Sequence, residues 1–178
     1  MTRWRPGEKR ADIASMLRVD QAGEYGATRI YAGQLAVLRA NCPEAKLISR
    51  MAAQEQLHLD RFNALLSERR VRPTALQPLW NVAGFALGAV TALMSEKAAL
   101  ACTDAVETEI DRHYGRQLDD LGDSDPELAA DIAEFRADEI QHRDSARDAG
   151  ATMAAGYPLL TAAIRAGCKV AIALSKRI

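Results

Sequence analysis

The chain has 178 residues, a formal net charge of −1 and charged residues at 26% of its positions. This length allows one domain with a hydrophobic core, and the balanced charge excludes a global field that would attract nucleic acid. The chain is rich in alanine and leucine, has only 6 prolines and shows no run of alternating β-branched residues. We therefore expect a single all-α domain over residues 1–178 with no nucleic-acid partner.

Cysteine usage and the N-terminal segment bear on the compartment. The cysteines occur singly, at Cys42, Cys102 and Cys168, so neither a disulfide framework nor a thiolate zinc site is expected. The segment Met1–Arg10 is short, basic and polar, without the apolar stretch of a secretion signal. We expect a reducing compartment, and either a bacterial chain or a eukaryotic one whose targeting segment has been removed.

Apolar periodicity predicts six helices along the chain. We expect them, in order, at about residues 10–40, 44–69, 79–94, 96–121, 126–149 and 158–177. Asn41 is the expected N-cap before Pro43, and Ser95 caps the fourth helix. Asp125 followed by Pro126 is a strong start signal for the fifth helix.

The third and sixth helices have compositions that suit a membrane surface. Residues 73–95 carry no charge, yet the helix at 79–94 is shorter than the roughly 20 residues needed to span a bilayer. Its Gly84 and Gly88 allow another helix to approach closely. We expect this helix to contact membrane or an apolar ligand; the alternative is a buried crossover helix. The last helix mixes apolar residues with cations, as in helices that lie on anionic membranes.

Two segments of the chain, at roughly 10–70 and 95–150, resemble each other. Each contains one glutamate followed on the next helix by Glu-x-x-His. The register, with one residue inserted between the helices of a pair, aligns these positions: Glu24 with Glu107, Tyr31 with Tyr114, Gln34 with Gln117, Glu55 with Glu139, and His58 with His142. We interpret this as an internal duplication of a helix pair.

The repeated acidic and histidine residues predict a metal centre. On a helix, residues i and i+3 share one face, so each Glu-x-x-His can address the same metal pair. One glutamate from each of two helices and Glu-x-x-His from each of two others is the di-iron carboxylate arrangement. Four carboxylates also neutralise two ferrous ions. The expected ligands of two Fe ions are Glu24, Glu55, His58, Glu107, Glu139 and His142.

A single Glu-x-x-His is usually only a solvated pair on a helix surface. Here, however, two of the 3 histidines have a glutamate three residues before them. Both also have a matched upstream glutamate, which favours the metal site over coincidence.

Other residues near the predicted ligands are weaker candidates. Asp20, Asp60 and Asp144 are placed to accept the second N–H of a metal-bound histidine, although each is as readily a surface residue. His113 and Tyr114 lie two turns beyond a predicted ligand and are candidates for a proton or electron relay. Core packing is the alternative for Tyr114.

Two glycines inside the first predicted helix need a compensating reason. Gly23 and Gly26 flank Glu24, and each costs about 1 kcal/mol relative to alanine in a helix. Close helix packing and open space for a substrate beside the metal both explain them, and the sequence leaves the two open.

Several longer motifs resemble the demethoxyubiquinone hydroxylase family of ubiquinone biosynthesis. The resemblance covers nearly the whole chain from Arg18 onward. Its motifs are Arg18-Val-Asp-Gln-Ala-Gly-Glu-Tyr-Gly-Ala27, Arg29-Ile-Tyr-Ala-Gly-Gln34, Val71-Arg-Pro-Thr74, Pro78-Leu-Trp-Asn-Val82, Gly84-Phe-Ala-Leu-Gly-Ala89, Ala101-Cys-Thr103 and Ala166-Gly-Cys-Lys-Val-Ala-Ile172. The iron ligands of that family match all six residues predicted above.

The resemblance implies a ferritin-like four-helix bundle with an added crossover helix and a C-terminal helix. It implies a monooxygenase that adds a ring hydroxyl to demethoxyubiquinol, using O2 and reducing equivalents from NADH or quinol. It also implies peripheral attachment to the membrane that holds the polyprenyl quinone. This is the cytoplasmic face of the bacterial inner membrane, or the matrix side of the mitochondrial inner membrane, where a lipid-binding partner protein is then expected.

For NADH, the resemblance implies a set of basic residues. Lys169 and Arg177 fit this role. Ser15 stands where we place another basic residue of the set, so direct use of NADH is left open. The rival functions are an iron store or ferroxidase, which should have a polar surface, and a rubrerythrin-type peroxidase, whose Cys-x-x-Cys module is lacking here.

Overall fold

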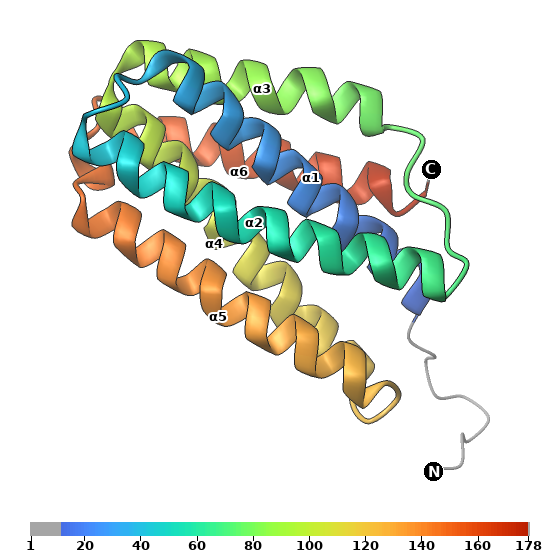
Figure 1. Cartoon of the computed structure of the whole chain (residues 1–178). Helices are drawn as coiled ribbons and strands as arrows, with labels where there is room; N and C mark the ends of the chain where they lie inside the picture. The colour runs from blue at the N-terminus through green and yellow to red at the C-terminus, as the bar shows by residue number, and fades with distance from the viewer. Residues whose placement is uncertain (1–11, 178) are drawn as a thin grey trace.

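The computed structural model describes residues 12–177, and all regular elements in this part of the chain are helical (Figure 1). The segment Met1–Arg10, with its expected lack of a secretion signal, lies outside the described residues. The expectation of an all-α fold is confirmed. The elements are α1 (Ile13–Val37), α2 (Pro43–Glu68), α3 (Gln77–Met94), α4 (Glu96–Leu121), α5 (Pro126–Asp148), a 3₁₀ turn η1 (Ala151–Met153) and α6 (Tyr157–Ser175).

The helix starts follow local capping chemistry. Ser95 and Asp125 each accept a hydrogen bond from the backbone N–H three residues later, as predicted. Asn41 is not the N-cap of α2, so that expectation was wrong. Pro43 is itself the first helical residue, which makes Cys42 the cap, and the Cys42 Sγ accepts from a backbone N–H 3.3 Å away.

The first helix is shorter than expected at both ends. Asp12 caps its start by accepting a hydrogen bond from the Ser15 N–H. At its other end Leu38 already has extended backbone dihedrals, so the chain leaves the helix before residue 40.

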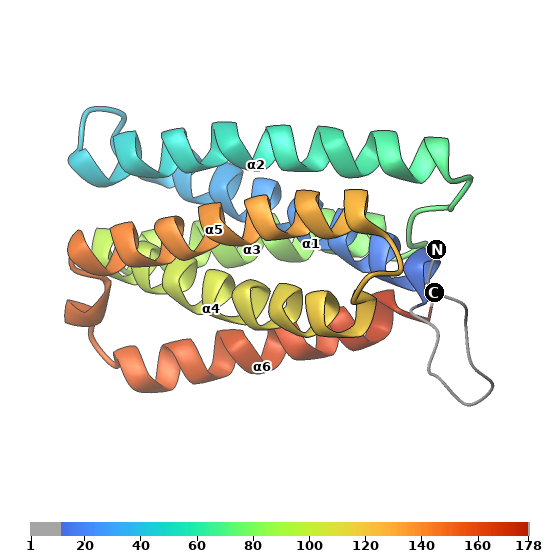
Figure 2. The ribbon, with the colours of Figure 1, turned by 90° about the horizontal axis from the view of Figure 1, so that it is seen from below.

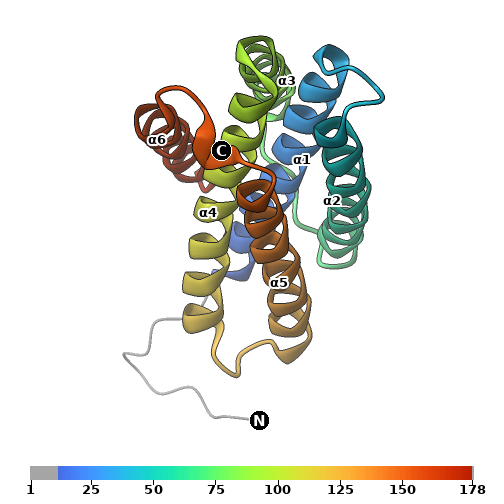
Figure 3. The same ribbon diagram turned by 90° about the vertical axis from the view of Figure 1, so that its left-hand side faces the viewer.

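Four helices form a bundle and two are added to it. α1 packs against α2 and α4 against α5, while α3 lies along α1 and α6 lies along α4. The view in Figure 2 shows α2 and α6 on opposite sides of the molecule. Figure 3 shows α3 beside α1 and α6 beside α4. This confirms the ferritin-like bundle with a crossover helix and a C-terminal helix. The duplication of a helix pair stays a prediction.

The apolar core is divided along the bundle axis. One cluster includes Ile48 and Met51 of α2, and another includes Phe62 and Leu65 farther along the same helix. The Glu-x-x-His segment at 55–58 falls between them. Two apolar layers therefore hold a polar layer in the middle of the bundle, where bulk water is excluded.

α3 is anchored to the bundle by glycines and otherwise exposed. Its buried residues are Gly84, Gly88, Thr91 and Ala92. A Cβ atom on Gly88 would lie 1.9 Å from the Ile30 carbonyl oxygen, so only glycine permits this approach of α3 to α1. Most of the other side chains of α3 face outward, which contradicts the alternative of a buried crossover helix.

α6 also presents an apolar surface. Within the described residues, Tyr157–Ser175 is the helix whose length and composition would suffice to cross a membrane, and 17% of its most apolar window is buried. Leu159 is 79% exposed and Val170 58% exposed. Together, α3 and α6 leave much of their apolar area uncovered by the rest of the protein.

The close crossing of α1 and α3 yields a stability prediction. A Cβ on Gly33 would lie 2.1 Å from the Phe85 carbonyl oxygen, whereas a Cβ on Gly26 in the same helix would meet nothing within 4 Å. Gly33→Ala should lower the free energy of unfolding by about 1–3 kcal/mol through overpacking. Gly26→Ala should raise it by as much as about 1 kcal/mol through helix propensity. Denaturant titrations of both variants, followed by circular dichroism, test this; equal effects would contradict the crossing geometry.

Candidate metal centre

The six predicted ligand residues come together in the middle of the bundle. Their side chains form two groups, each with candidate ligand atoms within 4.8 Å of one another. Glu55 and Glu139 belong to both groups. Glu24 and His58 complete the first group, and the second is completed by Glu107 and His142, all buried. The arrangement could hold two cations side by side, with two of the carboxylates common to both groups.

Each histidine faces the glutamates with its Nδ1 atom. The Nδ1 of His58 lies 3.3 Å from Glu139 Oε1 and 3.7 Å from Glu24 Oε2. The Nδ1 of His142 lies 3.0 Å from Glu55 Oε1. Each histidine thus faces the Glu of the other Glu-x-x-His, so the two helices α2 and α5 meet through this cluster.

The cluster contains many buried polar atoms without a hydrogen-bond partner. They include both carboxylate oxygens of Glu55 and Glu139, one oxygen each of Glu24 and Glu107, and the Nδ1 atoms of both histidines. Unpartnered buried polar atoms are rare and need an explanation. In this cluster the unpartnered atoms lie close together between the helices, and they are carboxylate oxygens and imidazole nitrogens. The donor set fits divalent cations bound between the helices.

Two tyrosines hold the outer oxygens of the unshared glutamates. The Tyr31 hydroxyl donates to Glu107 Oε1 at 2.6 Å, and the Tyr114 hydroxyl donates to Glu24 Oε1. Each tyrosine lies two turns after one glutamate and bonds the other, so α1 and α4 exchange these contacts. Tyr31 was missed as a site residue, although the repeat register that aligns it with Tyr114 could have identified it.

The outer nitrogen of each histidine also has a partner. The Nε2 of His58 lies 3.1 Å from an oxygen of Asp138, and the Nε2 of His142 lies 3.0 Å from the amide oxygen of Gln54. Both partners immediately precede the glutamate of the facing helix. These contacts fix the ring orientations and leave the Nδ1 atoms for a metal.

The expectation that Asp60 and Asp144 accept from the histidines was wrong. Asp60 accepts a hydrogen bond from Gln56, and Asp144 accepts one from Arg143, both at the surface. A residue two positions after a helical histidine points about 200° around the helix from it, which explains the error. The partner comes from the facing helix, which spacing along one helix does not reveal.

Of the two candidate relay residues, one touches the cluster. Tyr114 contacts Glu24, whereas the His113 ring lies 3.1 Å from Asp20 Oδ1 and is not in hydrogen-bond contact with a predicted ligand. Gln117 also donates to Asp20, at 2.7 Å. The relay role stays a prediction.

Burial dominates the electrostatics of the carboxylates. Burial, together with the charges of neighbouring glutamates, raises the pKa of Glu55 and of Glu107 well above the ordinary value, and the pKa of Glu139 is also raised, chiefly by burial. For Glu24 burial also raises the pKa, but its proximity to His58 and Glu55 outweighs burial and leaves the pKa below the ordinary value. Without cations, the cluster therefore retains protons.

The pKa values of the two histidines are shifted in opposite directions. Burial lowers the pKa of His58, but its contacts with Glu139 and Glu24 outweigh burial and raise the pKa to about 10. Burial lowers the pKa of His142 below its ordinary value.

The candidate NADH residues lie outside the metal cluster. Lys169 is 62% exposed, and its Nζ is 4.0 Å from an oxygen of Glu109. Arg177 is exposed just beyond α6. There the Ser15 hydroxyl donates to the Lys176 carbonyl at 3.5 Å, so position 15 and Arg177 lie at the same end of the molecule. Lys169 lies two turns away along α6.

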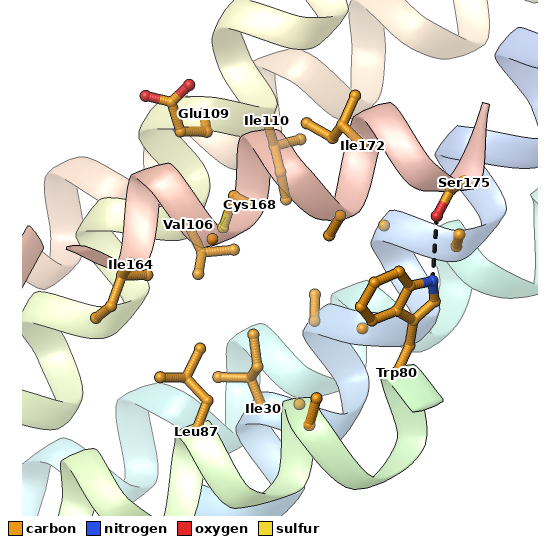
Figure 4. A pocket seen from close by; sticks show the side chains of 18 of the residues that line it. Ile30, Trp80, Leu87, Val106, Glu109, Ile110, Ile164, Cys168, Ile172 and Ser175 are labelled. Carbon is orange, nitrogen blue, oxygen red and sulfur yellow. Dashed lines mark hydrogen bonds between the residues drawn. The ribbon is translucent and has the colours of Figure 1, made fainter. Parts of the chain in front are cut away.

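A cavity of about 540 Å³ lies among α1, α3, α4 and α6 (Figure 4). Its lining is almost entirely apolar, and at one end the Trp80 indole N–H donates to the Ser175 hydroxyl at 3.1 Å. Gly23 and Gly26 line it, and a Cβ on either would meet nothing within 4 Å. This supports open space, rather than close packing, as the reason for these glycines. Val106, next to the ligand candidate Glu107, also lines the cavity.

A helical bundle with this buried cluster of carboxylates and imidazoles belongs to the ferritin-like class of proteins with a carboxylate-rich metal site. The sequence comparisons narrow the class. The family model described as "Ubiquinone biosynthesis protein COQ7" matches residues 11–175, and the chain belongs to this family.

Individual relatives agree with this assignment. The 3-demethoxyubiquinol 3-hydroxylase of Rhodospirillum rubrum is 54% identical over 166 residues, covering 93% of this chain and 78% of the relative. The mouse "NADPH-dependent 3-demethoxyubiquinone 3-hydroxylase, mitochondrial" is 51% identical, over 94% of this chain and 79% of the relative. The yeast "5-demethoxyubiquinone hydroxylase, mitochondrial" is 44% identical, over 94% and 79%. The family resemblance of the sequence motifs is confirmed.

The pKa shifts predict how stability of the metal-free protein depends on pH. Above pH 4.5, unfolded glutamates release protons that Glu55, Glu107 and Glu139 retain when folded, and His58 retains its proton up to about 10. Stability contributed by groups with raised pKa values is lost as pH rises. The free energy of unfolding should therefore fall from about pH 5 to 8. His142 opposes this trend as pH rises toward 6.5, because its pKa is lowered in the folded protein. Glu24, whose pKa is lowered from 4.5, is ionised in both states across this range and has no effect on the slope.

Thermal unfolding across this pH range, with chelator present, tests the expectation. Glu55→Gln removes one retained proton and should flatten the dependence. Excess Fe²⁺ under anaerobic conditions should reverse it, because metal ligands must be deprotonated. A metal-free protein that gains stability as pH rises would contradict the electrostatic description.

Proposed function

We propose that this protein hydroxylates the ring of demethoxyubiquinol by means of a di-iron centre and O2. The observation that carries the proposal is the buried cluster of unpartnered oxygen and nitrogen atoms beside a large apolar cavity. The family supplies the substrate class, since its relatives are named as demethoxyubiquinol or demethoxyubiquinone hydroxylases. The chain would thus act as an oxidoreductase in ubiquinone biosynthesis.

Two irons would be held by the six clustered side chains. One would be bound by Glu24 and His58, the other by Glu107 and His142, with Glu55 and Glu139 available to both. When bound, such a centre supplies two electrons and open coordination positions for activating O2. Four carboxylates balance the charge of two ferrous ions, which removes the electrostatic cost of the metal-free cluster.

The protein side chains around the centre provide orientation and exclude water. Tyr31 and Tyr114 each bond one oxygen of an unshared glutamate and leave its other oxygen for the metal. The apolar layers on both sides keep bulk water from the cluster. Exclusion of water favours reaction with the bound ring over wasteful release of reactive oxygen.

The cavity fits a quinone with an isoprenoid tail. The ring would approach the cluster near Gly23 and Val106, which adjoin the ligand residues in sequence and line the cavity. The tail would extend between α3 and α6 among apolar side chains such as Leu87 and Ile164 (Figure 4). Pockets of this composition bind through shape and apolar burial, with few polar contacts.

The exposed apolar faces of α3 and α6 support peripheral membrane attachment. Both helices line the cavity and present apolar side chains outward, so a membrane there would cover their surface and supply the quinone directly. Lys176 and Arg177, exposed just beyond α6, would meet anionic headgroups, whereas Arg165 is already paired with Glu109 at 2.7 Å. In a bacterium the surface would be the cytoplasmic face of the inner membrane. Eukaryotic relatives are named mitochondrial, and in a eukaryotic chain the surface would be the matrix side of the mitochondrial inner membrane.

The electrons would come from NADH or from a quinol. Several relatives are named NADPH-dependent, which supports a nicotinamide donor. Lys169 and Arg177 would contact its phosphates, although Glu109 beside Lys169 weakens this site for an anion. A reduced quinone ring in the cavity is the other donor. A mitochondrial chain would also use a lipid-binding partner protein on the α3–α6 surface.

The membrane surface leads to a liposome prediction. Val82 is 69% exposed and Leu93 is 72% exposed on α3. Replacing both with Glu should reduce co-sedimentation with anionic liposomes about tenfold or more, since charges are costly at an apolar membrane contact. Leu57→Glu, at a 66% exposed position of α2, is the matched control and should bind normally. Equal loss in the control, or full binding by the α3 variant with metal content unchanged, would refute this surface.

The reaction itself leads to an isotope prediction. With ¹⁸O-labelled O2, iron and a reductant, the new ring hydroxyl should carry the label, measured by mass spectrometry of the quinone product. Glu107→Gln should lower the rate by at least about 100-fold, because it removes a ligand charge, while the amide oxygen of Gln can still accept from Tyr31. Label derived from water would exclude an oxygenase. Consumption of iron and O2 with an unchanged quinone would favour a ferroxidase.

A further inference from the structure

The two halves of the metal cluster differ in one charged contact. Both histidines direct Nδ1 toward the glutamates, so a metal-bound neutral ring carries its proton on Nε2 and donates from there. The acceptor for His58 is the carboxylate of Asp138, at 3.1 Å. The acceptor for His142 is the amide oxygen of Gln54, at 3.0 Å.

These two acceptors occupy the same place in the repeat. The register that aligns Glu55 with Glu139 also aligns Gln54 with Asp138, since each directly precedes the shared glutamate. The same structural position thus carries a negative charge in one half and a neutral amide in the other. The difference is therefore not a consequence of helix geometry.

A second contact strengthens the same half. The Phe135 ring stacks on the His58 ring, with centroids 4.2 Å apart and an interplanar angle of 27°. In the repeat register the corresponding residue of α2 is Met51. The His58 ring is therefore held on its face by Phe135 and at its edge by Asp138.

The chemical consequence follows from the charge of the acceptor. A carboxylate that accepts the outer N–H of a metal-bound imidazole makes a charge-assisted hydrogen bond and increases the electron donation of the ring to the metal. A neutral amide oxygen orients the ring but adds no charge. Asp138 is 30% exposed, so solvent reduces its Coulomb effect without removing the hydrogen bond.

We infer that the two metal positions are unequal, and that Asp138 is a positioning residue that makes the Glu24–His58 position the tighter one. The inference rests on the di-iron centre proposed above. The position of Glu107 and His142 then loses its metal first. An ion of higher charge is also stabilised less at the position of Glu107 and His142 than at the position of Glu24 and His58.

Stepwise binding of Co²⁺ to the metal-free protein tests the inference. Calorimetry gives the two dissociation constants, and visible absorption of the bound cobalt reports on each step. In the wild type, the two Co²⁺ dissociation constants should differ by more than they would for two identical sites. Asp138→Asn keeps an acceptor and removes the charge, so it should weaken the tighter step by about tenfold, with the weaker step unchanged.

Gln54→Glu tests the same idea from the other half. It should strengthen the weaker step by about tenfold, and the double variant with Asp138→Asn should again show two separate steps. Asp60→Asn and Asp144→Asn are the matched controls, because these aspartates lie on the same two helices without contacting a histidine. Both controls should leave the two constants unchanged.

The outcomes separate this inference from the proposed function. Failure of the wild type to bind two metals would overturn the di-iron centre itself. Two bound metals with equal constants would overturn only the inequality. Unchanged constants in Asp138→Asn, or a similar loss in Asp60→Asn, would overturn the role of Asp138. If Asp138→Asn does not fold, the Gln54→Glu result alone decides.

Discussion

The burial of four carboxylates in the middle of a small helical bundle is the constraint on which the rest of the structure depends. Ionised carboxylates away from water are costly unless opposite charge is present. The protein offers two imidazoles and two tyrosine hydroxyls to this layer, which is not enough to satisfy the glutamate oxygens. The two apolar layers that flank the cluster compensate for the cost. Cations bound as proposed would stabilise the native bundle as well as enable the proposed chemistry.

The same constraint explains why the fold and the clustering of the six candidate ligands could be predicted from the sequence. Glu55 and His58 must share one helix face to reach a common metal, and the same holds for Glu139 and His142. That requirement sets the Glu-x-x-His spacing, which can be recognised in the amino-acid sequence alone. The start of α5 at Pro126 could also be predicted from the sequence, because helix capping involves only residues that are near one another in the chain.

Contacts between different helices could not be predicted from the sequence in this way. The acceptors Asp138 and Gln54 come from the helix that faces each histidine, so only the packing of α2 against α5 reveals them. The cap of α2 at Cys42 was missed because a cysteine side chain is an unusual acceptor. The cavity was indicated only indirectly, by Gly23 and Gly26, and its volume depends on how far α3 and α6 stand from α1 and α4.

The cavity is bounded by the same two helices that expose apolar surface, α3 and α6. A ligand that reaches it from a bilayer does so by lateral diffusion in two dimensions and never needs to enter bulk water. For the proposed quinone ligand, occupancy of the cavity would then be governed by the mole fraction of quinone in the membrane rather than by moles per litre of solution. Diluting the vesicles at fixed lipid composition should leave turnover per bound enzyme unchanged, whereas diluting the quinone with inert lipid should slow it.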